Sequence, residues 1–457
     1  MRRKSEALLA FAWNDPSLPK VVRQEREKYK GISRMLDTHP EILDAVHEDL
    51  KRLSTHGGGF RRGRGGDFTS ETILRALILH AIEGLSLRDT VIRIAESPFL
   101  QDFIRTRKLA TMDFTFLDKC LLAIQPSTWK RVNGLLAKAA LAAGKIDPAT
   151  VRADTTVVEA NIHHPTDSSL LWDVWRVASR WLKRARKIDR QSVPHRFHSK
   201  KIKRLHLTIT RFIKSKSPPR QREVRQSFRT LIERTGWIVA NVAAFCTYAR
   251  NSVSLELAAI ADELEAMLPA MKQVVAQATR AQVQGETVPA AERVFSIFEP
   301  HTELIMRGRR EKPVEFGHKA LLVQTPEKFI TDYEVYEKQV ADCNLTKTVI
   351  ERHEALFGTT PEVLAADKGF CPDAEEYARL EKQVGTLAIP KRLRDFADAL
   401  MGAWQAFRAG IEGTISGLKR AFRLSRCFYR HYNGFARAIG LGVLSHNLLV
   451  LSKLKTT

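Results

Sequence analysis

The chain has few cysteines for its length. Five cysteines stand singly among 457 residues, at positions 120, 246, 343, 371 and 427, and no two of them form a C-x2-C pair. This spacing argues against a structural zinc site and against a disulfide framework. It is typical of a chain that folds in a reducing cytosol.

Long apolar runs are also missing. No window holds 18 uninterrupted apolar residues, so the sequence predicts no membrane span. The opening stretch, MRRKSEALLAFAWNDP, has only a short apolar run and no convincing secretory cleavage site. The apolar stretch 435–454 is interrupted by Gly440 and Gly442, which favours a helix packed on the core. We therefore expect a cytoplasmic chain with no membrane partner.

Acidic residues are scarce relative to basic ones. The chain has 74 Lys and Arg against 51 Asp and Glu, a net charge of +23, which favours a polyanionic partner such as nucleic acid. Residues 176–235 alone hold 20 basic residues against three acidic ones. We call this stretch the basic block and expect it to lie along DNA; a solubilising arm or a dimer contact is the alternative. Candidate DNA contacts in it are Lys183, Arg184, Arg186, Lys200, Lys201 and Lys203.

Residues 1–145 are predicted to form a helical domain. A helical pattern begins at Asp67, can be capped by Thr69 or Ser70, and ends at Gly84. Ser86 and Asp89 then form a capping signature that opens a second helix. The pair is compatible with a helix-turn-helix DNA reader, although an ordinary helical hairpin has the same pattern. The glycine-rich basic stretch 57–66 is interpreted as a linker, with backbone tracking on DNA as the alternative.

The remaining chain alternates between two patterns. Residues 146–169 and 290–457 are predicted to form one α/β domain, and 170–289 a helical basic insertion within it. His163, His164 and Asp167 could be drawn as metal ligands, but adjacent loop histidines more often have other roles. Short strands are predicted at Val294–Phe298, Glu303–Arg307, His318–Gln324 and Phe329–Tyr336. The helix Leu345–Phe357 then crosses over to the strand 363–366, so strands are followed by a helix and a further strand.

Three carboxylates stand in positions that favour chemistry. Asp154 interrupts the β-branched run 151–158, where a buried charge must be paired or bind a metal. Asp367 follows the apolar run 363–366, at the carboxyl end of a predicted strand, although Asp also ends strands as a turn residue. Glu412 lies in a basic helical pattern, with Arg408 four residues before it and Lys419 seven after it. Such hard oxygen ligands favour Mg²⁺ or Mn²⁺.

These motifs resemble a known family. The Asp154-Thr155-Thr156 strand, the stretch Ala366-Asp367-Lys368-Gly369-Phe370 and the R-x3-E-x6-K signature from Arg408 to Lys419 are similar to bacterial insertion-sequence transposases of the DDE superfamily, IS5/IS4-like branch. The resemblance runs from about residue 60 to the end, the insertion excepted. One departure is Gln405, which stands where the family usually has a Tyr three residues before the Arg.

The resemblance implies an RNase H-like mixed sheet with flanking helices, preceded by the helical domain and interrupted by the insertion. It implies a nucleoid-associated enzyme whose Asp154, Asp367 and Glu412 bind two Mg²⁺ or Mn²⁺ ions about 4 Å apart. Arg408 and Lys419 would contact phosphates, and Lys368 is a further candidate, with a solvated turn lysine as its alternative. The partner would be double-stranded DNA, both terminal inverted repeats and target, bound by a homodimer or higher assembly.

The implied reaction is cleavage at the element's ends followed by strand transfer. One alternative is a domesticated DNA-binding protein that no longer cuts. The other is a Mg²⁺-dependent nuclease that hydrolyses DNA without joining it.

Overall fold

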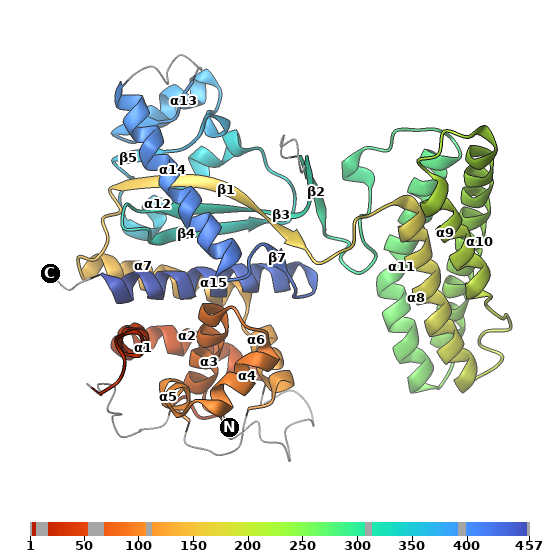
Figure 1. The fold of residues 1–457 in the computed structure, drawn as a ribbon, viewed down its shortest axis with the longest axis horizontal. Coiled ribbons are helices and arrows are strands. Elements are labelled where there is room, and N and C mark those ends of the chain that lie inside the picture. The colour runs from red at the N-terminus through yellow and green to blue at the C-terminus, as the bar shows by residue number, and fades with distance from the viewer. Residues whose placement is uncertain are drawn as a thin grey trace. The chain divides into compact units, whose positions relative to one another are not determined.

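The computed structural model describes residues 2–5, 17–53, 68–106, 112–306, 313–391 and 399–454. The chain forms two compact units. The first contains Met1–Glu159 and His318–Thr457, and the second contains Ala160–Gly317 (Figure 1). The predicted basic linker at 57–66 and Arg307, the last residue of the predicted strand Glu303–Arg307, lie outside the described residues.

A seven-stranded mixed sheet joins segments from residue 150 to residue 427. Its strands are β1 (Thr150–Ala160), β2 (Glu303–Met306), β3 (Val314–Gln324), β4 (Ile330–Tyr336), β5 (Val363–Ala365), β6 (Thr386–Ala388) and β7 (Arg426–Cys427). The order is β2-β3-β1-β5-β6, with β4 on β3 and β7 on β1. Pairing is parallel from β1 through β5 to β6 and antiparallel between β3 and both β2 and β4. This mixed arrangement is consistent with an RNase H-like core.

The register of β1 on β5 decides where two of the acids fall. Arg152 lies opposite Ala365 in a parallel pair. Asp154 and Asp367 each follow two residues later, so Asp154, inside β1, lies at the level where the neighbouring β5 has just ended. Helix α12 (Leu345–Phe357), predicted with these bounds, packs on the sheet through Val349 and Ile350.

Helices of the first unit enclose a second core. They are α1 (Lys20–Thr38), α2 (Pro40–Arg52), α3 (Ser70–Glu83), α4 (Leu87–Glu96), α5 (Pro98–Phe103), α6 (Phe114–Ala123), α7 (Pro126–Ala142) and the last helix, α15 (His431–Lys453). The predicted caps are confirmed. Thr69 accepts from Thr72 N and Ser86 accepts from Asp89 N, while Gly84 ends α3 at a φ of 58°.

Helix α15 is long and apolar enough to cross a membrane by composition, but 67% of its most apolar window is buried. It runs beside α7 between the sheet and the N-terminal helices (Figure 1). Leu441, Leu444 and Leu448 belong to the core that α15 forms with α3 and α7. The predicted apolar tail is therefore a core helix.

The second unit is largely a helical bundle. It consists of α8 (Asp167–Ile188), α9 (Ser199–Phe212), α10 (Pro218–Arg250) and α11 (Leu255–Gln282), followed by η2 (Ala290–Glu292). Trp175, Leu231 and Leu264 contribute to its core. Two of the side chains that could be drawn as metal ligands from the sequence have separate partners. His163 Nε2 lies 2.6 Å from Asp173 Oδ2, and Asp167 accepts a hydrogen bond from Gln282 Nε2 at 2.7 Å.

The predicted strand Val294–Phe298 is wrong. Four of its five residues are apolar, as in a buried strand, but Val294 bonds to a side chain and not to a neighbouring strand. Val294 N donates to Gln277 Oε1 at 2.9 Å, and Gln277 Nε2 donates to Val294 O at 3.1 Å. Phe295, Ser296 and Ile297 are buried in succession, so the apolar run belongs to a buried irregular segment.

Candidate active site

Asp154 and Asp367 lie close together where β5 ends. Asp154 is largely buried, with 14% of its side chain exposed, and its Oδ1 accepts from Thr155 N at 2.7 Å. Asp367 caps the short helix η4 (Lys368–Phe370), where its Oδ1 accepts from Gly369 N at 2.8 Å. Each carboxylate keeps one oxygen that is not used by these backbone bonds.

Helix α14 (Ala399–Arg420) brings the third acid. Its docking depends on the buried Arg152, whose Nη1 donates to Phe407 O at 2.7 Å and whose Nε donates to Gln324 Oε1 at 2.8 Å. Gln324 Nε2 in turn donates to Thr414 Oγ1 at 2.6 Å. These bonds join β1, β3 and α14, and they fix which face of the helix meets the sheet.

That face carries Arg408 beside two of the acids. Arg408 Nη1 lies 3.2 Å from Asp154 Oδ2 and 3.2 Å from Glu412 Oε1, as the predicted helical spacing requires for the second contact. The side chain of Glu412 is 63% exposed and that of Arg408 only 18%. The guanidinium therefore stands between a buried carboxylate and one that can turn in solvent.

The charges at the site are coupled. Burial, the neighbouring carboxylate of Asp367 and, to a lesser extent, that of Glu412 together raise the pKa of Asp154 to about 6. The backbone of Thr155 and the guanidinium of Arg408 oppose this shift in the pKa. An acid whose ionisation is resisted by two other acids is a ligand suited to a bound cation.

Sequence reasoning missed a fourth carboxylate, Asp342. Its Oδ1 accepts from Lys319 Nζ at 2.8 Å and from Thr155 Oγ1 at 3.2 Å. A Cβ built on Gly369 would lie 3.7 Å from Asp342 Oδ2 and 3.0 Å from Asp367 Oδ1, so the two acids flank the same glycine. The available signal was Lys319, a buried cation in the apolar strand β3 that needs an anion nearby.

Gln405, the departure from the family pattern, supports the Asp367 strand. Its Nε2 donates to Ala366 O at 3.1 Å and to Ala388 O at 3.3 Å. The amide thus holds the backbone at the ends of β5 and β6, one residue before Asp367.

Residues 307–448 match the family model described as the transposase DDE domain. The chain therefore contains a transposase DDE domain. The matched region contains Asp367, Arg408, Glu412 and Lys419, whereas Asp154 lies before it. No curated protein and no solved structure matches the chain.

DDE transposases cleave DNA with divalent metal ions, and the acids of this transposase fit such ions by their donor chemistry. Asp154, Asp367 and Glu412 offer hard carboxylate oxygens, and their mutual repulsion would be relieved by a cation. Within the described ranges, no three His, Cys, Asp or Glu side chains converge closely enough to hold a metal ion as they stand. Arg408 Nη1 contacts both Asp154 and Glu412, and the Glu412 side chain is the more exposed of the two acids.

The predicted DNA contacts of the transposase fall into different environments. Lys368 is exposed beside Asp367, and Lys419 is half-buried near the end of α14. Arg186 is half-buried, and its Nη1 donates to the carbonyl oxygens of three loop residues, Val193, Pro194 and His195. The exposed members of the predicted set in the basic block are Lys183, Arg184, Lys200, Lys201 and Lys203.

Proposed function

We propose that this transposase, of the IS5/IS4-like branch, cuts DNA at the terminal inverted repeats of its element and joins the freed ends to target DNA. The observation that carries the proposal is the parallel register of β1 and β5. This register brings Asp154 beside Asp367. Helix α14 brings Glu412 to the same place, because Arg408 contacts both Asp154 and Glu412.

In this proposal Asp154, Asp367 and Glu412 hold two Mg²⁺ or Mn²⁺ ions. When bound, the ions supply an activated hydroxyl and neutralise charge on the phosphate and on the leaving oxygen. The carboxylates contribute by being ionised and fixed. Asp367 is oriented by Gly369 N, and Asp154 by Thr155 N.

Arg408 has two roles in the proposal. Without DNA its guanidinium offsets the negative charge of Asp154 and Glu412. With DNA, phosphate oxygens provide an alternative partner of the same charge, and the planar guanidinium suits them. Lys419 and Lys368 would add positive charge toward the same strand.

DNA binding away from the acids is assigned to two regions. The α3–α4 pair would read the terminal repeat, and the basic block would hold the backbone without reading sequence. Because two element ends must be held together for joining, we expect a homodimer or a higher assembly on the DNA.

The test is a reaction on a plasmid that carries the DNA flanking this reading frame. The purified transposase with Mg²⁺ should nick or cut at the flank boundaries and yield products joined to a second plasmid. Cleavage without joined products would show that the protein is a nuclease that does not join DNA. DNA binding without cleavage in the presence of either Mg²⁺ or Mn²⁺ would show that the protein binds DNA but no longer cuts it.

A further inference from the structure

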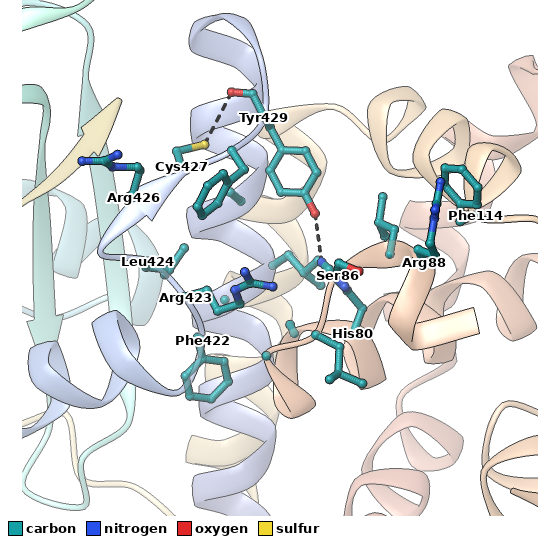
Figure 2. Close-up of a pocket in the computed structure, with 18 residues that line it drawn as sticks. His80, Ser86, Arg88, Phe114, Phe422, Arg423, Leu424, Arg426, Cys427 and Tyr429 are labelled. Atoms are coloured by element: carbon teal, nitrogen blue, oxygen red, sulfur yellow. Dashed lines mark hydrogen bonds between the residues drawn. The ribbon is translucent and has the colours of Figure 1, made fainter. Parts of the chain in front are cut away.

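A cavity of the first unit lies apart from the three acids. It has a volume of about 430 Å³ and is formed by the α3–α4 turn, the segment after α14, and α15 (Figure 2). Gly84 brings the first two together: a Cβ there would lie 2.5 Å from Ala421 O, and its positive φ also disfavours a side chain. His80 Nε2 and Tyr429 Oη, 2.9 Å apart, join the same two segments.

The cavity is lined mainly by apolar and aromatic side chains. Rings come from Phe114, Phe422, Phe428 and Tyr429, and aliphatic walls from Leu87, Leu424 and Leu441. His80 adds no positive charge, because burial lowers its pKa to about 4. The interior therefore offers flat apolar surfaces and few polar groups for recognising a ligand's edges.

Two arginines stand at its aromatic walls. The guanidinium of Arg88 lies 4.7 Å from the ring centroid of Phe114, and that of Arg423 lies 5.6 Å from the centroid of Phe428. In the part of the chain that the structure describes, neither arginine has a carboxylate within 4.0 Å. The backbone of Arg423 has a φ of 57°, a conformation that a non-glycine residue adopts at a cost. A third arginine at the cavity, Arg426, is paired with Glu159 at 3.2 Å.

We propose that this cavity binds one unstacked nucleobase of the DNA, with the adjoining phosphates on Arg88 and Arg423. Aromatic rings beside guanidinium groups are typical of sites that bind single-stranded nucleic acid. The bases stack on the rings, and the negatively charged phosphates of the backbone lie against the guanidinium groups. The inference rests on the proposed function, because it takes DNA as the ligand.

The position along α14 agrees with this assignment. From Glu412 to Arg420 the helix continues for eight residues, about 12 Å at 1.5 Å per residue, and the cavity wall begins two residues later at Phe422. At a spacing of roughly 3.4 Å per nucleotide, a strand at the acids reaches this wall within about four nucleotides. A base near a cut end is therefore within range.

The test uses three DNA probes in the presence of a chelator, so that no cleavage occurs. They are a blunt duplex, the same duplex with a short thymidine tail, and the same duplex with an abasic tail of equal length. The abasic tail keeps the phosphates and removes the bases. The wild-type chain should bind the thymidine tail more tightly than the abasic tail by a factor within the roughly 5- to 150-fold expected of one stacked base.

Phe428→Ala should remove this preference. The Phe428 side chain is 58% exposed, so its truncation should leave the fold intact. Phe298→Ala is the matched control, because Phe298 is also exposed beneath an arginine, Arg176 at 5.7 Å, but does not line the cavity. The control should keep the wild-type preference. Arg423→Gln should weaken binding of both tailed probes while keeping their ratio.

Equal affinity of the wild type for the two tails would overturn the proposal, as would an unchanged preference in Phe428→Ala. If Phe428→Ala instead abolishes a dimer seen by sedimentation and leaves the tail preference intact, the cavity belongs to a second copy of the chain. Failure of Mg²⁺-dependent cleavage would count against the proposed function alone, since the tail measurement requires no cleavage.

Discussion

Gly410 of α14 lies against the guanidinium of Arg152, and a Cβ at position 410 would overlap Arg152 Nη1 and lie 3.0 Å from Cζ. The close approach allows Arg152 to reach Phe407 O and the ring of Phe407, 4.7 Å away. These contacts hold α14 at this point, and so they set the positions of Arg408 and Glu412 on the same helix.

Gly410→Ala should lower the free energy of unfolding by about 1–3 kcal/mol, because the methyl group must displace a buried arginine. Cleavage should fall further than this loss implies, because Glu412 moves with the helix. Gly413→Ala is the control: nothing lies within 4 Å of a Cβ there, so stability should be unchanged or rise by up to about 1 kcal/mol. Urea unfolding and a cleavage assay measure both effects. Equal behaviour of the two variants would contradict the docking role of Gly410.

Asp367→Asn should abolish Mg²⁺-dependent cleavage while leaving DNA binding largely intact. The variant loses a ligand charge but keeps the basic surface. We expect a loss of at least about 100-fold in cleavage rate, the upper end of effects seen when only supporting groups of a metal site are removed. Asp373→Asn, in the exposed cap of α13 (Ala374–Glu381), should cleave normally. Near wild-type cleavage by Asp367→Asn would refute the assignment.

Stability without metal should decline as the pH rises from about 4 to about 6. The pKa of Asp154 is raised from 3.8 to about 6 in the folded state, so the folded chain binds this proton more tightly than the unfolded chain does. Its contribution is fully present at low pH and is lost as the pH passes the folded pKa, an effect of up to about 3 kcal/mol. Denaturant unfolding in chelator should show a flatter pH dependence for Asp154→Asn than for the wild type. Parallel curves would contradict the shift.

The basic block should account for much of the affinity for DNA of any sequence. Replacing Lys183, Arg184, Lys200, Lys201 and Lys203 by Gln should flatten the slope of log K against log salt by several units, at roughly 0.9 per phosphate contact. Discrimination between terminal-repeat and random DNA should change little, because phosphate contacts carry no sequence information. Arg186 is left unchanged in this variant because it holds loop carbonyls. An unaltered slope would assign the block to assembly or solubility.

Asp342→Asn should slow cleavage by about 10- to 100-fold with little change in DNA affinity, because Asp342 supports Thr155 and lies beside the Asp367 turn. Glu337→Gln, an exposed acid five residues earlier, is the control and should cleave normally. Single-turnover cleavage rates and binding isotherms separate the two effects. A loss of affinity in proportion to rate would indicate that Asp342 acts on DNA binding instead.

The elements were largely predictable because local patterns decide them. Capping residues and apolar spacing gave α3, α4 and α12 close to their true bounds, and the i,i+4 spacing placed Arg408 against Glu412. The apolar run at Val294 failed as a strand signal, because an irregular segment is buried there and bonds to Gln277 of α11.

The supporting contacts of the site could not be predicted in the same way. Asp342 meets Thr155 across 187 residues, and Arg152 meets Phe407 across 255. Such pairs depend on strand order and on how α14 crosses the sheet, which no local pattern specifies. The positions of the three acids in the sequence pointed to a site but not to the contacts that orient them.

The chain leaves the sheet after β1 and returns to it in β2 and then in β3, which is the neighbour of β1 in the strand order. The helices α8 to α11, which carry the basic block, are thus inserted between β1 and β2 of a single sheet. At the level of the gene, one in-frame deletion between the codons of β1 and β2 would remove all four helices and leave β1 to β7 encoded. The transposase gene is therefore open to loss or exchange of its basic unit as one block, with the acids and α14 encoded entirely on either side of it.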